Sequence, residues 1–372
     1  MTEETNTDID LTLSRPPRNE YRHYSSKAYF THAPSKTQFQ QGYLGVQPSI
    51  IKGTFHLRYP EAQPLLVERI EITFKGKGSV RWKQGKREYR RVNKFFRLTK
   101  RIWSSLASDH FEPIVSLDLP FEFTIPDVSP SSIPQIDNGI IKYSLKAKIY
   151  RKSNFIMKFS SKIIEVWVNI NRWNLPPAPD YETLPITKRF EMFECQMSLN
   201  QTIFDANDTI NIPIKFILFD MRVSVKKVVV RLKQYHRLKA HDHDSKLTKK
   251  YVAGHEVSGD QILMSSDSSN EFLVGLKLNL PESHDLRCSC NTILIDIWHR
   301  IKVRIHMGNA NTSYVNFEKD VKIYNVIPAD SFILDMGERT ATRSTIQSLF
   351  DANEHRWIDE ISGDELPEYQ NR

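Results

Sequence analysis

The sequence predicts an all-β chain of two tandem immunoglobulin-like β-sandwiches. Three observations support this: apolar residues alternate at a spacing of two, long helical apolar patterns are absent, and a proline-rich segment divides the chain. The 372 residues leave room for two domains of roughly 100–200 residues each, with tails. Closely spaced strands with one buried face are typical of sandwiches rather than of alternating strands and helices.

The strands are predicted from this alternation. In residues 141–149, Ile141, Tyr143 and Leu145 alternate with lysines and a serine, which indicates one buried face and one exposed face. Residues 164–170 and 301–305 repeat the pattern. Further strands are predicted at 70–74, 228–232, 276–280, 293–297 and 321–324, with turns at 76–78, 126–130, 138–139 and 207–208. The segment 93–106 fits either a short helix or an irregular strand.

Four prolines between residues 174 and 185 cannot lie inside a sheet, so this segment is predicted to be an extended linker. About 140 residues on either side suffice for one sandwich each. The predicted divisions are a disordered segment at 1–24, sandwiches at 25–173 and 187–329, the linker at 174–186, and an acidic tail at 330–372. A short helix is expected near 345–351.

Composition narrows the class of protein. Hydrophobic residues at 40% and charged residues at 26% are typical of a globular chain. The polar, acidic first ten residues do not resemble a signal peptide, and no apolar run has the length of a membrane span. Three cysteines are too few for a disulfide framework, so a reduced, cytoplasmic protein is expected.

Charge is unevenly distributed. The net charge is +8, yet residues 330–372 contain ten acids and four arginines. Residues 1–329 are therefore strongly basic, which favours anionic partners such as lipid headgroups, phosphopeptides or nucleic acid. The competing interpretation is that the charged residues only form a solvent-exposed face. Residues 75–101 contain twelve Lys/Arg and one acid. From this segment we expect anionic-lipid or phospho-cargo binding by Lys83, Lys86, Arg87, Arg90, Arg91 and Lys94.

Ordered motifs in the first half carry a family resemblance. Residues 50–57 and 67–82 read as two strands, the second with a Gly-Lys-Gly and a terminal Trp82. Residues 119–126 read Leu-Pro-Phe-Glu-Phe-Thr-Ile-Pro and precede a Pro/Ser turn and an Ile-x-Tyr-x-Leu-x-Ala strand. Together they resemble the arrestin fold, and residues 190–214 are similar to its second sandwich. The chain looks like an α-arrestin of the fungal arrestin-related trafficking adaptor type.

This resemblance implies a non-enzymatic adaptor. Such proteins recruit WW-domain HECT ubiquitin ligases to plasma-membrane transporters or receptors, whose tails are the cargo, for ubiquitination, endocytosis and sorting. It implies a peripheral location at the plasma membrane or endosomes, with anionic phospholipids as further partners. Neither a cofactor nor nucleic acid is expected.

The tail contains a match to the ligand of WW domains. Leu366, Pro367 and Tyr369 form Leu-Pro-x-Tyr. Pro367 fixes its own φ and restricts Leu366, so the segment favours polyproline II, and Tyr369 can enter an aromatic groove. Pro179 and Tyr181 in the linker form a poorer second copy, for which a stiff linker is the competing interpretation.

The sequence contains no recognisable motif for a metal-binding or catalytic site. The segment 241–244 has metal-ligand residue types, but consecutive loop residues rarely converge on one ion. Cys288 and Cys290 lack the second pair that a zinc site needs. Phosphate-loop, nucleophile-elbow and zinc-protease motifs are also missing. We therefore expect no catalytic residue and no metal site. The alternatives are a retromer-subunit-like sorting scaffold without ligase recruitment and a basic nucleic-acid-binding protein.

Overall fold

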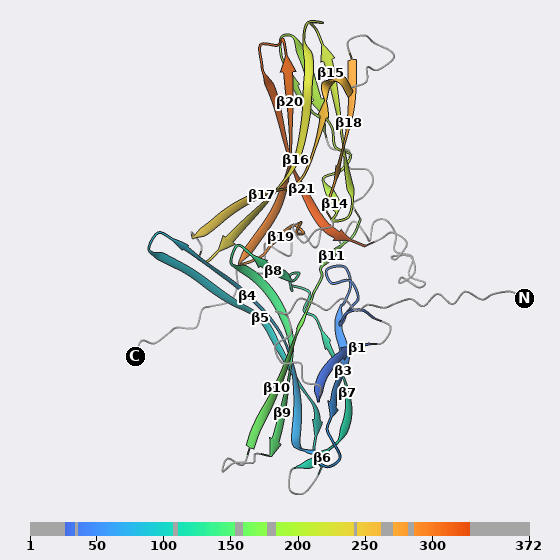
Figure 1. Cartoon of the computed structure of the whole chain (residues 1–372), viewed down its shortest axis with the longest axis vertical. Coiled ribbons are helices and arrows are strands. Elements are labelled where there is room, and N and C mark those ends of the chain that lie inside the picture. The colour runs from blue at the N-terminus through green and yellow to red at the C-terminus, as the bar shows by residue number, and fades with distance from the viewer. Residues whose placement is uncertain are drawn as a thin grey trace, which may run out of the picture. The chain divides into compact units, whose positions relative to one another are not determined.

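The structure is a computed structural model that describes residues 27–33, 36–106, 111–152, 159–176, 184–241, 244–261, 271–281 and 286–327. In these ranges the chain folds into strands and one short 3₁₀-helix, η1 (Gly259–Gln261). The strands form two β-sandwiches, which confirms the fold class predicted from the sequence (Figure 1). Within the described residues, no helix is long and apolar enough to cross a membrane.

The first sandwich pairs a four-stranded sheet with a six-stranded sheet. The smaller sheet consists of β1 (Ala28–His32), β2 (Gln40–Gln41), β3 (Ile50–Arg58) and β7 (Ser116–Thr124). The larger has the order β10-β9-β4-β5, with β6 and β8 at its margins. Its strands are β4 (Leu65–Gln84), β5 (Arg87–Ser104), β6 (Glu112–Ile114), β8 (Ile133–Ile136), β9 (Gly139–Lys152) and β10 (Phe159–Val168).

The second sandwich pairs a seven-stranded sheet, order β11-β21-β20-β16-β17, with a four-stranded sheet, order β12-β13-β15-β18. The larger sheet contains β11 (Trp173–Asn174), β14 (Ile203–Asp205), β16 (Ser224–Lys239), β17 (Ser245–Ser258), β19 (Cys290–Asn291), β20 (Ile295–Gly308) and β21 (Tyr314–Val326). The smaller contains β12 (Ile186–Arg189), β13 (Phe193–Met197), β15 (Thr209–Leu218) and β18 (Glu271–Asn279).

Apolar residues at every second position of the strands point into the core, as the sequence predicts. In β9, Ile141, Tyr143 and Leu145 are buried, whereas Lys142 and Lys146 keep partial exposure on the other face. The Tyr143 hydroxyl donates a buried hydrogen bond of 2.6 Å to the carbonyl of Pro130. This bond satisfies the polar group of a side chain whose ring lies in the core.

The turn predicted at residues 76–78 is wrong. Gly76 and Gly78 lie inside the continuous strand β4, beside a bulge at Gly76/Lys77. A Cβ on Gly76 would lie 2.6 Å from the Tyr143 ring, and one on Gly78 would lie 2.7 Å from Leu294 Cδ1. These glycines therefore allow close packing against large side chains rather than a change of chain direction.

Two other assignments are resolved by strand pairing. The ambiguous segment 93–106 belongs mostly to β5, which pairs with β4 along its length. A second basic stretch, residues 226–250, includes Lys246, Lys249 and Lys250, and these three lysines lie on β17, which pairs with β16. In both strands, pairing with a neighbouring strand stabilises a segment whose local strand propensity is weak.

The seven-stranded sheet contributes to two hydrophobic cores. On its inward face, Val228, Val230 and Leu232 of β16 belong to the core of the second sandwich. Further along the same face, Leu238 of β16 and Ile295 of β20 pack with residues of the first sandwich. The polar residues Gln234, His236 and His299 occupy the inward positions between the two cores, and we call these three residues the polar belt.

Several expectations concern residues outside the described ranges. These are the disordered segment at 1–24, most of the linker, the tail from 330, the helix near 345–351, and part of the segment 241–244. The predicted limits of the two domains stay predictions. β11, immediately before the described part ends at residue 176, pairs in parallel with β21 of the second sandwich.

Candidate functional site

The most basic part of the chain forms the β4–β5 hairpin. Its register joins Gln84 to Arg87, which leaves Gly85 and Lys86 as a two-residue turn. Gly85 has φ +59° in the first turn position, as a type II′ turn requires. This turn twists in the same sense as the strands, so long paired strands can continue directly from it.

The aromatic side chains of the hairpin lie on its inner face, whereas most of its basic side chains, though not Arg87 and Arg91, lie on the outer face. On the inner face Trp82 is buried and stacks on Tyr89, with ring centroids 5.2 Å apart. Phe95 and Phe96 pack against the same core. The interleaved aromatic residues are therefore core residues, and their rings do not lie among the exposed cations of the other face.

The outer face of the sheet β10-β9-β4-β5 collects cations from three strands, and we call these residues the cationic face. By register and alternation, cations on this face far outnumber the acids, which are Glu71, Glu88 and Glu165. The cations include Arg69, Lys75, Lys77, Arg81 and Lys83 on β4, Arg90, Lys94, Arg97 and Arg101 on β5, and Lys142, Lys146 and Lys148 on β9.

One row across the cationic face consists of three lysines. Lys77 of β4 lies opposite Lys94 of β5 on one side and opposite Lys142 of β9 on the other. Directly opposed side chains in a sheet are about 4.5–5.5 Å apart at Cβ, and like charges there are destabilising. Lys142 also lies over the Trp167 ring, 4.1 Å from its centroid. Because repulsion in this row costs stability, an anionic partner on the row would relieve it.

The acids of the cationic face are already paired, and Glu71 accepts from Arg69 Nε at 3.2 Å. Glu165 accepts from Lys75 Nζ at 2.8 Å and from Ser144 at 2.8 Å. Burial alone would raise the pKa of Glu165, but these hydrogen bonds and the charge of Lys75 hold it below its usual range. Glu88 accepts from Arg81, and this bond lowers the pKa of Glu88.

Three cations near the middle of the face have no such partner. Among the residues that the structure describes, Lys77, Lys94 and Arg97 form no ion pair, and all three side chains are exposed. Their ammonium and guanidinium groups are therefore available to an external anion. Guanidinium and ammonium groups both bind phosphates and carboxylates, and arginine does so in bidentate geometry.

The predicted anion-binding residues do not all lie on the same face of the hairpin. Lys83, Arg90 and Lys94 lie on the cationic face, whereas Lys86 lies in the turn. Arg87 and Arg91 alternate with Arg90 and therefore point to the opposite side of β5. Whether these residues bind anions stays a prediction. The predicted WW-ligand residues, Leu366, Pro367, Tyr369, Pro179 and Tyr181, lie outside the described residues.

Sequence reasoning missed the contribution of β9. Lys142, Lys146 and Lys148 were recognised as the exposed side of a strand, but nothing in their spacing assigns them to the basic hairpin. The pairing of β9 with β4 brings them there. The only signal in the sequence was the excess of lysine on one face of an alternating run.

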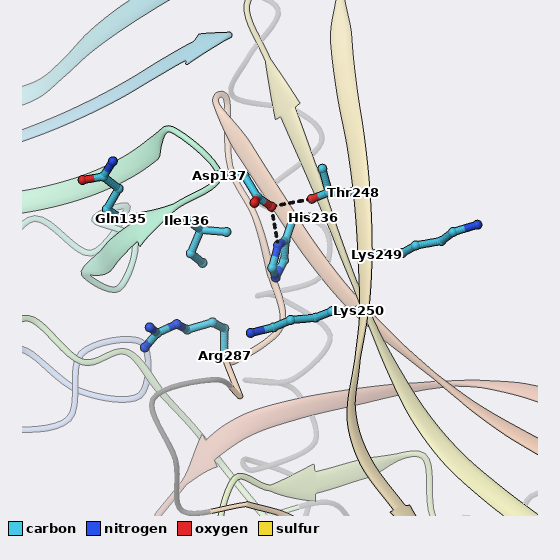
Figure 2. A pocket seen from close by; sticks show the side chains of 8 residues that line it. All are labelled: Gln135, Ile136, Asp137, His236, Thr248, Lys249, Lys250 and Arg287. Carbon is cyan, nitrogen blue, oxygen red and sulfur yellow. Dashed lines mark hydrogen bonds and ion pairs between the residues drawn. The ribbon is translucent and has the colours of Figure 1, made fainter.

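A pocket of about 270 Å³ lies where the β8–β9 turn meets β16 and β17. Figure 2 shows Lys250 and Arg287 extending into it while Lys249 points away. Asp137 of the turn, with φ +45°, accepts hydrogen bonds from Thr248 at 2.6 Å and from His236 Nδ1 at 3.2 Å. Hydrogen bonding to Thr248 and His236 outweighs the effect of burial and lowers the pKa of Asp137.

The polar belt continues inward from this pocket as a chain of hydrogen bonds. The backbone N–H of Arg287 donates to Gln234 Oε1 at 2.8 Å, which fixes the orientation of the amide. Gln234 Nε2 therefore donates to His236 Nε2 at 2.8 Å, and His299 Nε2 donates to Gln234 Oε1 at 3.0 Å. His299 Nδ1 then accepts from the Ser289 hydroxyl at 3.0 Å.

This arrangement requires both histidines to be neutral. Each imidazole uses one nitrogen as donor and the other as acceptor, so an added proton would place a donor against a donor. Burial lowers the pKa of His236, and burial followed by the charge of His236 lowers the pKa of His299 to about 3. The belt is therefore a neutral, hydrogen-bonded layer between two apolar cores.

The described residues hold no group of His, Cys, Asp and Glu side chains arranged to bind a metal ion. Burial raises the pKa of Cys288 to about 11 and of Cys290 to about 12. At neutral pH both thiols are protonated and poor nucleophiles.

Most of the second sandwich matches a known domain family. Residues 191–327 match the family of the arrestin (or S-antigen) C-terminal domain. This match supports a place in the arrestin superfamily and indicates an arrestin-like adaptor role. It spans β13 to β21 and does not include the cationic face. A comparison with curated proteins finds no significant match.

Proposed function

We propose that the chain is a non-enzymatic trafficking adaptor of the α-arrestin type. It recruits a WW-domain HECT ubiquitin ligase to plasma-membrane transporters or receptors, which are then ubiquitinated, internalised and sorted. The observation that carries the proposal is the match of residues 191–327 to the arrestin C-terminal domain. The adaptor works in the cytoplasm, peripheral to the plasma membrane or endosomes.

The cationic face supplies the docking function in this proposal. A broad surface on which cations far outnumber acids, and whose acids are paired, attracts acidic or phosphorylated cargo tails and anionic phospholipids. Near an anionic membrane each exposed Lys or Arg contributes about 1 kcal/mol. Unpaired cations such as Lys77, Lys94 and Arg97 contribute most, because no carboxylate has to be displaced from them.

The tail motif supplies ligase recruitment. Leu366, Pro367 and Tyr369 dock on a WW domain in a polyproline II conformation, and Pro179 with Tyr181 is the weaker second ligand. Nucleic acid is a poorer partner for this chain. The aromatic residues of the basic hairpin pack against the core on its inner face, so their rings offer little surface for stacking with bases.

A pull-down of the full chain with a panel of WW domains from HECT ligases tests the proposal. We expect binding that Tyr369→Ala abolishes, with Tyr314→Ala as the control at an exposed tyrosine of the second sandwich. Loss of ligase binding on deletion of residues 366–369, with cargo binding retained, also supports an adaptor. If no WW domain binds the chain, a retromer-subunit-like sorting scaffold replaces the adaptor proposal.

A further inference from the structure

Strand β10 forms one edge of the six-stranded sheet, and β5 forms the other. Among the described residues, β9 is the only strand that pairs with β10, and all ten residues of β10 take part in that ladder. The side of β10 that faces away from β9 therefore presents backbone N–H and C=O groups without a strand partner. Such an edge pairs readily with another extended chain unless its sequence or geometry prevents it.

β10 lacks the features that usually block an edge, which are charged side chains, prolines and bulges. β5 has seven Lys/Arg, and its ladder with β4 contains two register shifts. β17, the edge of the seven-stranded sheet, has three lysines and one register shift. β10 has one lysine, one glutamate and no proline, and its ladder with β9 is regular from end to end. It is therefore the least protected of these three long edges.

Both charged side chains of β10 are engaged within their own chain. Glu165 forms an ion pair with Lys75 at 2.8 Å. Lys162 Nζ donates to the Tyr59 hydroxyl at 3.2 Å and lies 5.6 Å from the centroid of that ring. Between these two residues, Ile163 is 40% exposed on the outer face. An approaching strand thus meets a neutral edge with an exposed apolar side chain, which selects neither an acidic nor a basic segment.

We propose that β10 pairs with β10 of a second copy of this chain, antiparallel and centred on Ile163, and so forms a symmetric dimer. A two-fold axis requires a strand that is complementary to itself. Centred on Ile163, the pairing places this residue opposite its own copy. Ser161 then lies opposite Glu165. Lys162 lies opposite Ile164, so no like charges oppose each other.

The charge of the first sandwich favours β10 over β5 for this contact. Neighbouring strands lie about 4.7–4.9 Å apart, so the lysines of β9 in the two copies would be roughly 14 Å apart across the paired β10 strands. That distance exceeds the Debye length of about 8–10 Å in ordinary buffers. Pairing through β5 would instead bring the seven cations of each copy together. The inference does not depend on the proposed function, because it rests on the edge of one strand alone.

Sedimentation velocity of the full chain at increasing concentration tests for the dimer. We expect a reversible equilibrium between monomer and dimer. Ile163→Lys places a cation opposite its own copy and should weaken dimerisation by about tenfold or more. The matched control is Val92→Lys. Val92 is also 40% exposed and lies on the outer face of the same sheet, but on the opposite edge strand, so this variant should dimerise like the parent chain.

Cross-linking tests the register of the pairing. In Ile163→Cys the two introduced thiols would face each other, with Cβ atoms about 4.5–5.5 Å apart, so a short bis-maleimide should link two copies. The same reagent should not link Val92→Cys. The three native thiols react poorly, because burial raises the pKa of each to about 11 or 12.

The outcomes separate this inference from the proposed function. A chain that stays monomeric at every concentration would overturn it, and so would a dimer that Ile163→Lys leaves intact. Equal cross-linking of Ile163→Cys and Val92→Cys would contradict the register. Circular dichroism establishes that each variant is folded, and cross-linking of Ile163→Cys decides alone if Ile163→Lys does not fold. WW-domain binding is measured separately, so its loss would affect only the adaptor proposal.

Discussion

Gln234 and His299 are joined by a hydrogen bond of 3.0 Å. They lie on the seven-stranded sheet, between the part that packs in the first hydrophobic core and the part that packs in the second. The bond fixes the tautomer of His299 because Gln234 Oε1 can only accept. Both side chains are fully buried. The hydrogen bonds of the polar belt therefore depend on the protonation state of its histidines, whereas the apolar packing of the two cores does not.

Stability should decrease as the pH falls below about 6.5. The folded-state pKa of His299 is lowered to about 3, so the unfolded chain binds protons that the folded chain rejects. The stabilising contribution is fully present above the unfolded pKa of about 6.5 and is lost as the pH falls. For this residue alone the loss between pH 7 and pH 5 is about 2 kcal/mol. Urea unfolding at several pH values measures it.

The control for this prediction is His299→Gln. Its amide can donate to Gln234 and accept from Ser289, but it does not titrate. The variant should lose part of the pH dependence between pH 7 and pH 5, and His236, whose pKa is also lowered, should account for part of the remainder. An unchanged pH slope in His299→Gln would show that the belt does not carry the effect.

Gly76→Ala should destabilise the first sandwich by about 1–3 kcal/mol, because the new methyl group must displace the buried ring of Tyr143. Gly275→Ala on β18 is the matched control, since nothing lies within 4 Å of its Cβ position. There the substitution should be neutral or slightly stabilising, because alanine restricts the unfolded chain. Midpoints of thermal unfolding compare the two. Similar effects of both substitutions would contradict the packing argument.

Reversing three of the unpaired cations of the cationic face should weaken binding to anionic vesicles. Lys77→Glu, Lys94→Glu and Arg97→Glu together should reduce affinity for phosphatidylserine vesicles at least about tenfold at low salt. The difference should shrink as salt rises, since the Debye length falls to about 8–10 Å in ordinary buffers.

The control for the vesicle experiment makes the same change of charge elsewhere. Lys36, Lys226 and Lys277 are exposed and do not belong to the cationic face. Their replacement by glutamate should have a smaller effect in a vesicle sedimentation assay. Equal losses in both triple variants would mean that net charge, and not the cationic face, determines binding.

Leu366→Pro should strengthen binding of a tail peptide (residues 363–372) to WW domains, because a second proline restricts the unbound chain further. Phosphorylation of Tyr369 should block binding, because it adds close to two negative charges at the residue that must be buried. Isothermal titration measures both. Tighter binding after phosphorylation would contradict insertion of the tyrosine ring.

Much of the fold could be predicted from local patterns. Alternation in residues 141–149 indicated the strand β9 and its buried face, because side-chain direction in a strand repeats every two residues. The same rule failed at Gly76 and Gly78. Glycine is typical of turns, and only the position of Tyr143 and Leu294 shows that here it permits close packing.

The sequence alone determined the strand content, the two-sandwich class and the concentration of charge in residues 75–101, because these follow from periodicity and composition. The tertiary structure decided which charges meet. Lys77, Lys94 and Lys142 form one row only because β9 pairs with β4 and β4 with β5. It also placed Gln234 and His299, more than sixty residues apart, in one buried hydrogen bond. Strand pairing joins residues distant in sequence, and no local periodicity encodes the partner of a strand.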